Sequence, residues 1–192
     1  MNAYKHISKS FQEEYKTRTQ ALKSRLIQWR AEGTVVGLDK PTNIARARKL
    51  GYKAKQGITV ARVKVERGLS MRPKPHRGRK PSKYGRYFAY RKSLQARAED
   101  RAARKFSNCE VLNSYFVGSD GTSKFYEVIL VDRAHPAMRN DANYAPITNQ
   151  MGRAYRGLTT AGRKHRGIIQ KGFGTTQNRP SIRHNQRAIK VV

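Results

Sequence analysis

The residues best suited to chemistry lie in a short loop from Gly51 to Gly57, where two glycines bracket Tyr52, Lys53 and Lys55. Glycine lets a backbone come close to a phosphate, lysine supplies positive charge, and a tyrosine ring can stack on a base. No Asp or Glu occurs from residue 40 to residue 65. The pattern favours a phosphate-binding loop over the alternative, an ordinary connection between a helix and a strand with solvated charges.

Short elements on both sides must hold this loop in place. Residues 42–50 predict a helix with Thr42 as its N-cap, because Thr accepts hydrogen bonds from the first free N–H groups. Residues 58–66 alternate as a strand does, with Ile58 and Val60 on the charged face, so its first half should be covered on both sides. The cations of these elements that we expect to contact a polyanion are Arg46, Arg48, Lys49, Arg62 and Lys64.

A second candidate binding segment spans residues 67–92 and mixes arginine, lysine, glycine, proline and aromatic residues. Its prolines exclude a regular helix through most of it. Cations suit phosphate contacts, and rings suit stacking on unpaired bases. A disordered cationic linker is the alternative, and the density of aromatic residues argues against it. The candidate contacts are Arg72, Lys74, Arg77, Arg79, Lys80, Lys83, Tyr84, Arg86 and Arg91.

A third segment, from Gly157 to Lys164, has the outline of a P-loop. Its lysine comes one position late, His165 stands where Ser or Thr should follow, and no buried strand is expected before it. We therefore interpret it as a further cationic stretch and not as a nucleotide site. The candidate contacts here are Arg153, Arg156, Arg163, Lys164 and Arg166.

Catalytic and metal-binding patterns find little support in the sequence. The five histidines are scattered without ligand spacing, and the carboxylates are too dispersed for a magnesium-dependent nuclease. The single cysteine, Cys109, excludes an intrachain disulfide and is expected to be a small buried residue just before a strand. We expect no enzymatic activity, no cofactor and no metal site.

Composition narrows the partner to a polyanion. The 192 residues include 42 Lys and Arg against 12 Asp and Glu, which gives a formal net charge of +30. Self-repulsion of that size calls for a polyanionic partner, and nucleic acid is the usual one. The chain shows no signal peptide and no apolar run of membrane-spanning length, so we expect a cytoplasmic protein.

The acids also divide the chain into regions. None occurs from residue 67 to residue 98 or after Asp141. We expect a helical N-terminal arm (1–33), a folded body (34–137) with an extended basic loop (67–92), and a basic C-terminal extension (138–192). From Gly152 onward we expect this extension to be mobile in the free protein, because it offers little apolar surface to offset the entropy of ordering.

The periodicities predict an α+β body. A long helix should be interrupted near Thr17 and Thr19, and a helix from Ser93 to Phe106 should bury one face. Two alternating strands joined by an Asp-Gly loop predict a hairpin. The expected strands are 34–36, 58–66, 110–117 and 124–132, and the expected helices are 2–32, 42–50 and 93–106, with a further short helix near 181–190.

Five runs of sequence, together with Ala3-Tyr4-Lys5, closely resemble the large-subunit ribosomal protein family "fifteen-e" of archaea and eukaryotes. The match is colinear, covers most of the chain, and favours an archaeal source because the longer arginine-rich tail of eukaryotic members is missing. The five runs are Lys49 to Gly57, Ser93 to Gln95, Val111 to Tyr115, Phe125 to Leu130 and Arg156 to Lys164.

The resemblance implies a small mixed β-sheet of about four strands covered by helices, with long basic N-terminal, internal-loop and C-terminal extensions. It further implies a structural role inside large-subunit (23S-type) ribosomal RNA, next to other large-subunit proteins. RNA phosphates that are brought close together repel one another, and fixed arginines and lysines would replace the mobile counterions that screen this repulsion. A non-ribosomal nucleic-acid-packaging protein or an RNA chaperone is the alternative reading of the same charge.

Overall fold

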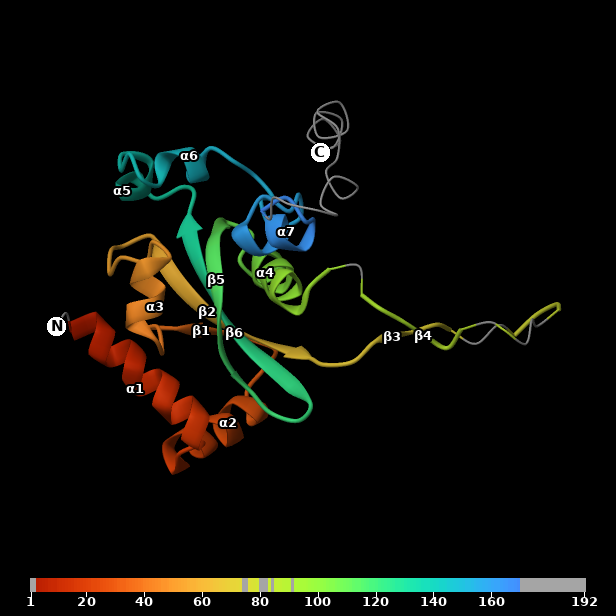
Figure 1. Cartoon of the computed structure of the whole chain (residues 1–192). Helices are drawn as coiled ribbons and strands as arrows, with labels where there is room; N and C mark the ends of the chain where they lie inside the picture. Colours follow the sequence, from red (N-terminus) through yellow and green to blue (C-terminus); the bar gives the residue numbers. More distant parts are fainter. Residues whose placement is uncertain (1–2, 74–75, 80–82, 84, 91, 170–192) are drawn as a thin grey trace.

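The computed structural model describes residues 3–73, 76–79, 83, 85–90 and 92–169. A four-stranded sheet lies between two groups of helices, which confirms the α+β class and the number of strands (Figure 1). The helices are α1 (Ala3–Thr17), α2 (Gln20–Ala31), α3 (Ile44–Lys49), α4 (Leu94–Lys105), α5 (Pro136–Arg139), α6 (Ala145–Thr148) and α7 (Thr160–His165). The strands of the sheet are β1 (Val35–Leu38), β2 (Ile58–Glu66), β5 (Cys109–Ser119) and β6 (Ser123–Asp132), and β3 (Ser70–Met71) pairs separately with β4 (Tyr87–Phe88).

The sheet has the strand order β1-β2-β6-β5, and each of its three strand pairs is antiparallel. This corrects the expectation of a mixed sheet. The β5–β6 hairpin confirms the predicted one, and Asp120 explains its turn. The Oδ1 atom of Asp120 accepts hydrogen bonds from the N–H groups of Thr122 (2.9 Å) and Ser123 (2.6 Å), which closes the loop locally.

One face of the sheet packs on α4. The hydroxyl of Ser93 accepts a hydrogen bond from the N–H of Ala96 (3.2 Å), so Ser93 is the N-cap that the sequence predicts. Ala98 and Ala102 are fully buried against the sheet. Their small side chains let the helix lie close to the strands.

The opposite face of the sheet packs on α3, α5 and the segment around Tyr144, with Ile58 and Val60 in its buried cluster. β2 is therefore covered on both faces, as its sequence predicts. Trp29 of α2 packs beside Phe125 of β6, with ring centroids 5.4 Å apart. Helices thus cover both sides of the sheet (Figure 1).

The N-terminal helix breaks where the sequence predicts. Arg18 has a positive φ of 49°, and the Thr19 hydroxyl caps α2 by accepting a hydrogen bond from the N–H of Leu22 (3.4 Å). No residue of α1 is buried. This helix touches the body through α3 and through Tyr15, whose ring lies 5.6 Å from that of Phe116.

The cap of α3 differs from the prediction by one position. Asn43, and not Thr42, accepts the capping hydrogen bond from the N–H of Arg46 (2.9 Å). The N–H of Thr42 instead donates to the buried carboxylate of Glu127, at 3.1 and 3.3 Å. The sequence could not show that a strand residue 85 positions away competes for this group.

Residues 152–169 pack on the body, which differs from the expectation that this part of the chain has no fold of its own. The N–H groups of Gly152 and Arg153 donate to the carboxylate of Glu110, at 2.7 and 3.2 Å. α7 contacts α4. Hydrogen bonds to Glu110, together with Ala154 in the core cluster, hold this segment on the body. The helix expected near 181–190 lies outside the described residues.

Candidate nucleic-acid interface

The exposed face of α3 presents three of the predicted cations. Ala45 and Ala47 are buried, while Arg46, Arg48 and Lys49 are exposed. Ala47 packs in the buried cluster on the sheet, whereas Ala45 lies on the side of the helix that faces α1. All three cations lie in the last turn, where the helix dipole favours positive charge.

The loop from Gly51 to Gly57 is only partly available to a ligand. Tyr52 is 8% exposed and belongs to the core, so it leaves the set of proposed stacking residues. Lys53 is exposed, and its Nζ lies 5.6 Å from the ring centroid of Tyr144. The hydroxyl of Tyr144 donates to the carbonyl of Gly51 (2.7 Å) and holds the loop on the body.

Lys55 has a partner within the chain. Its Nζ donates to Asp141 (3.1 Å) and to the carbonyl of Ala137 (3.1 Å). The pKa of Asp141 is lowered to about 2, because Asn143 donates hydrogen bonds to it and because Lys55 lies beside it. Lys55 therefore fastens the loop to the segment that follows β6.

The glycines of the loop are explained by packing. Gly57 has a φ of 85°, and a Cβ there would lie 2.7 Å from the Cγ of Met138 and 3.0 Å from the Cγ of His135. Gly51 has a φ of 99°, and a Cβ there would lie 3.2 Å from a side-chain carbon of Leu112. A close phosphate is not needed to account for either residue.

Two predicted contacts on β2 point into the fold. Arg62 is 8% exposed, forms an ion pair with Glu32 and lies with its Cζ 4.8 Å from the ring centroid of Trp29. The Nζ of Lys64 donates to the carbonyls of Arg30 and Glu32, both at 2.9 Å. These side chains bind the end of α2 to the sheet, so both leave the proposed contact set.

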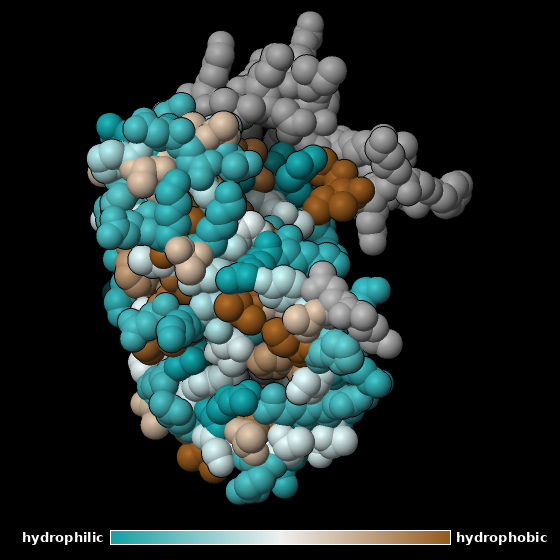
Figure 2. All heavy atoms as spheres, turned by 90° about the vertical axis from the view of Figure 1, so that its left-hand side faces the viewer, coloured by the Kyte–Doolittle hydropathy of each residue, from teal (hydrophilic) through white to brown (hydrophobic). Residues whose placement is uncertain are grey.

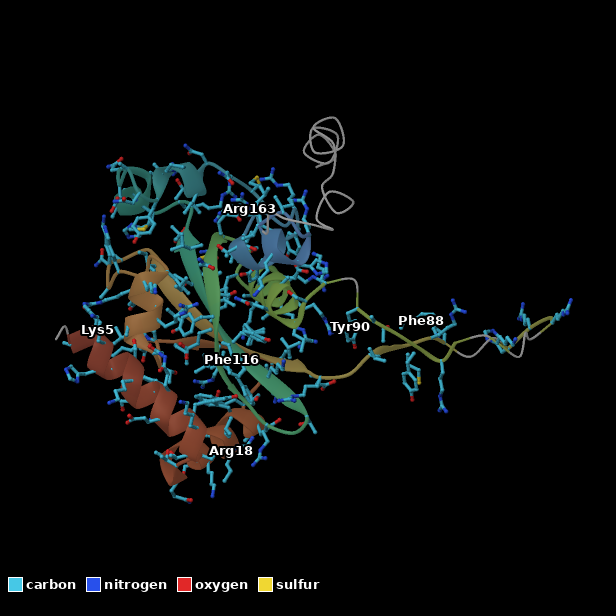
Figure 3. All side chains as sticks on the ribbon, in the orientation of Figure 1. Lys5, Arg18, Phe88, Tyr90, Phe116 and Arg163 are labelled. Atoms are coloured by element: carbon cyan, nitrogen blue, oxygen red, sulfur yellow. The ribbon has the colours of Figure 1, made fainter. Side chains whose placement is uncertain are left out.

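The described residues of the segment 67–92 leave the body as a long arm that includes the β3–β4 pair (Figure 1). Figure 3 shows side chains standing away from the ribbon along it, among them Phe88. Arg86 is exposed, and its Cζ lies 5.6 Å from the ring centroid of Tyr87. The Cζ of Arg72 lies 4.5 Å from the ring centroid of Phe88. Arg77, Arg79 and Lys83 are also exposed, whereas the predicted contacts Lys74, Lys80, Tyr84 and Arg91 lie outside the described residues.

The cations of the C-terminal segment divide into internal and exposed ones. Arg153 donates through Nη1 to the carbonyl of Val111 (2.6 Å), which fixes it to β5. Arg163 and Lys164 of α7 are exposed. Arg156 and Arg166 line a cavity of about 230 Å³ beside α4.

The P-loop outline in this segment corresponds to a structural turn. The hydroxyl of Thr159 accepts a hydrogen bond from the N–H of Gly162 (3.1 Å) and donates to Glu99. A Cβ on Gly162 would lie 2.6 Å from the Cα of Gly157, so two backbones meet there. The N–H of Gly162, which a P-loop would offer to a phosphate, is thus bonded to the Thr159 hydroxyl.

Buried carboxylates explain how the cationic segments are fixed. Glu99 accepts a hydrogen bond from Thr159, the N-cap of α7. Glu110 accepts hydrogen bonds from residues 152–153, and Glu127 accepts them from residue 42. Burial raises the pKa values of Glu99 and Glu127. Hydrogen bonds oppose the rise: Ser114 and Thr159 donate to Glu99, and Thr42 and Tyr115 donate to Glu127. The fold thus uses its few acids as internal acceptors.

Most of the other acids are also engaged within the chain. Ten of the twelve form an ion pair or accept a hydrogen bond in the structure, which leaves few to neutralise the surface. The ten are Glu13, Glu14, Glu32, Glu99, Asp100, Glu110, Asp120, Glu127, Asp132 and Asp141.

Sequence reasoning missed two cations of α1. A groove of about 420 Å³ between α1 and α3 includes Lys5 and Lys9 in its lining, together with the predicted Arg48 and Lys49. The available signal was the spacing of Lys5 and Lys9, which places them one helical turn apart on one face. Figure 2 shows that this side of the molecule is mostly hydrophilic, with hydrophobic residues in small patches.

The part of the chain that the structure describes presents neither a metal site nor a membrane-spanning helix. No group of three or more His, Cys, Asp or Glu residues there could hold a metal ion. No described helix is both long and apolar enough to cross a membrane.

Comparison with known proteins gives a consistent result. The family described as Ribosomal L15 matches residues 2–185. The "Large ribosomal subunit protein eL15" of Methanocella arvoryzae is 50% identical over 193 aligned positions, 98% of each chain. The protein of the same name from Picrophilus torridus is 51% identical over 168 positions, 86% of each chain. With a family match over nearly the whole length and relatives at half identity, this chain belongs to the Ribosomal L15 family, as an archaeal-type member.

Proposed function

We propose that the protein is a structural constituent of the large ribosomal subunit that binds and stabilises folded large-subunit ribosomal RNA. Its partners are 23S-type ribosomal RNA and neighbouring large-subunit proteins, in ribosomes of the cytoplasm. The names of its relatives support the assembly, and the charge distribution of the chain supports the mode of binding.

One observation carries the proposal. Ten of the twelve acids form an ion pair or accept a hydrogen bond within the chain, while cations of α3, of the arm at residues 67–92 and of α7 remain exposed. Folded RNA brings phosphates from separate helices together, and their repulsion opposes compaction. Cations held by the protein replace mobile counterions, whose release into solution is favourable.

The proposed contact set follows from exposure. Buried or internally bonded side chains cannot reach a phosphate without breaking the fold, which removes Tyr52, Arg62, Lys64 and Arg153. Lys55 could contact RNA only by exchanging Asp141 for a phosphate. The exposed contacts are Arg46, Arg48, Lys49, Lys53, Arg72, Arg77, Arg79, Lys83, Arg86, Arg163 and Lys164.

Two measurements test the proposal. A tagged full-length chain in cell extract is expected to sediment with the large ribosomal subunit. The purified chain is expected to bind an archaeal 23S ribosomal RNA transcript with an affinity that falls steeply with salt, because each phosphate contact adds about −0.7 to −0.9 to the log–log slope. Equal affinity for duplex DNA of the same length, with no sedimentation in the subunit fraction, would instead indicate a nucleic-acid-packaging protein.

A further inference from the structure

We propose that the groove between α1 and α3 is a docking site for an RNA strand, whose phosphates lie between cations on both walls. The inference rests on the proposed function and gives a binding role to α1, for which the sequence predicts only a helical arm. Its wall on α1 consists of Tyr4, Lys5, Ser8, Lys9 and Gln12, and its wall on α3 consists of Ala45, Arg48 and Lys49.

The charge of the groove selects an anion. Four of its eight lining residues are cations, two on each wall, and none is acidic. Lys5 and Lys9 are four residues apart, which places them about 6 Å apart along the helix axis. Figure 3 shows Lys5 near the N-terminal end of α1. A phosphodiester chain offers repeated negative charges to such paired rows, whereas a single small anion would use only part of them.

The ion pair of Lys9 does not block the site. Its Nζ lies 3.8 Å from the carboxylate of Glu13, and the two side chains are 76% and 63% exposed. Exposed pairs of this kind contribute little free energy. Lys9 can therefore exchange Glu13 for a phosphate at small cost.

α1 also lacks the cover that a helix of its length normally has. Helices in proteins are stabilised mainly by packing one face on the rest of the fold. This one has no buried residue and contacts the body through α3 and through Tyr15. Since four of its eight lining residues are cations and none is acidic, an RNA strand fits the groove better than an apolar protein segment does.

Tyr4 and the uncharged polar residues favour RNA over a simple polyanion. The Tyr4 ring is 37% exposed and lies 5.5 Å from the Cζ of Arg48, which also donates to the Tyr4 hydroxyl. A ring held in this way can stack on an unpaired base. Ser8 and Gln12 on the same wall can exchange hydrogen bonds with a ribose 2′-hydroxyl.

Charge removal on α1 provides the first test. The double variant Lys5→Gln/Lys9→Gln is expected to lower the magnitude of the log–log salt slope for the 23S transcript by about 1.4–1.8, twice the value per contact. The matched control Lys16→Gln/Lys23→Gln removes two exposed lysines outside the groove and is expected to change the slope by less than about 0.5. Circular dichroism verifies that both variants keep their helices.

The outcomes separate the groove from the general function. The groove would be overturned as an RNA site if the salt slope fell equally in both double variants, or if it did not fall in Lys5→Gln/Lys9→Gln. A wild-type chain that shows no steep salt dependence would instead refute the proposed function, whatever the variants do.

Crosslinking gives a second test that does not depend on charge removal. Ser8→Cys in the groove and the control Ser24→Cys on α2 are each labelled with a photoactivated crosslinker and bound to the transcript. Cys109 is 7% exposed, and burial raises its pKa to about 11, so it remains unlabelled near pH 7. Crosslinking from position 8 well above that from position 24 is expected, and equal yields would overturn the proposal.

Discussion

Arginine lies over an aromatic ring both in the body and in the arm, but the two settings differ. Arg62 of the body is 8% exposed and forms an ion pair with Glu32 above Trp29. Arg86 of the arm is exposed over Tyr87, in a stretch of sequence without any carboxylate. Burial beside a carboxylate therefore makes Arg62 a structural cation, whereas Arg86 remains accessible to a polyanion.

Electrostatics explains why the two regions diverge. Moving a charge out of water costs several kcal/mol unless a partner compensates it. In the body, Glu32 provides that compensation in the folded chain. In the arm, under the proposed function, RNA phosphates provide it only on assembly. Substitutions in the two regions should therefore change different measurements.

The largest effect is expected from neutralising the arm. The variant Arg77→Gln/Arg79→Gln/Lys83→Gln/Arg86→Gln should lower the salt slope for the 23S transcript by about 2.8–3.6, which corresponds to about 10³-fold weaker binding at 0.1 M salt. Its free energy of unfolding should remain within about 0.5 kcal/mol of wild type. Filter binding and urea denaturation measure the two quantities, and an unchanged slope would contradict the distinction between arm and body.

A body carboxylate should show the opposite behaviour. Glu127→Ala leaves the Thr42 N–H and the Tyr115 hydroxyl without their acceptor. The free energy of unfolding should fall by about 2–6 kcal/mol, since each of the two orphaned groups costs about 1–3 kcal/mol. Glu127→Gln keeps the shape and one acceptor and should cost less. Equal stability of wild type and Glu127→Ala in urea would show that this anchor is dispensable.

Arg62 offers the direct counterpart to the arm. Arg62→Gln removes the ion pair with Glu32 and the cation above Trp29, and should lower the free energy of unfolding by about 2–3 kcal/mol. The salt slope for RNA should not change, because this side chain does not reach the surface. A decrease in slope with normal stability would place Arg62 among the RNA contacts after all.

The smallest expected effect is a dependence of stability on pH. Burial raises the pKa values of Glu99 and Glu127 above 4.5, so between that value and their folded pKa values the folded state binds more protons than the unfolded state. Their contribution to stability is present below pH 4.5 and is lost as the pH rises through the folded pKa values. Urea denaturation from pH 4.5 to 7 should show a flatter profile for Glu99→Gln/Glu127→Gln than for wild type. Identical dependence of stability on pH in the variant and in wild type would refute the raised pKa values of Glu99 and Glu127.

Local signals made much of the body predictable. Three features depend on residues close together in the sequence, so local patterns predicted them. They are the Ser93 cap, the alanines of α4 and the Asp120 turn. Cys109 is buried, as expected, and is the first residue of β5. The short helices α5 and α6 have too few residues for any period to be visible.

Long-range polar contacts set the limit of prediction. Nothing near Thr42 in the sequence points to Glu127, and nothing near Gly152 points to Glu110. The packing of residues 152–169 was missed for this reason, since hydrogen bonds to Glu110 contribute to it. The groove likewise needs two helices that are separate in sequence, so only half of its cations could be predicted.

The position of β6 at the centre of the sheet has a consequence for synthesis of the chain. β2 must pair along Ile58–Glu66 with a strand that begins at Ser123, 57 positions after Glu66. At about 5–20 residues per second, one edge of β2 stays open for about 3–11 s, during which another chain could pair with it. The charges of Arg62 and Lys64 discourage such pairing by repulsion between copies. The nascent strand thus has its own protection against aggregation until its partner emerges.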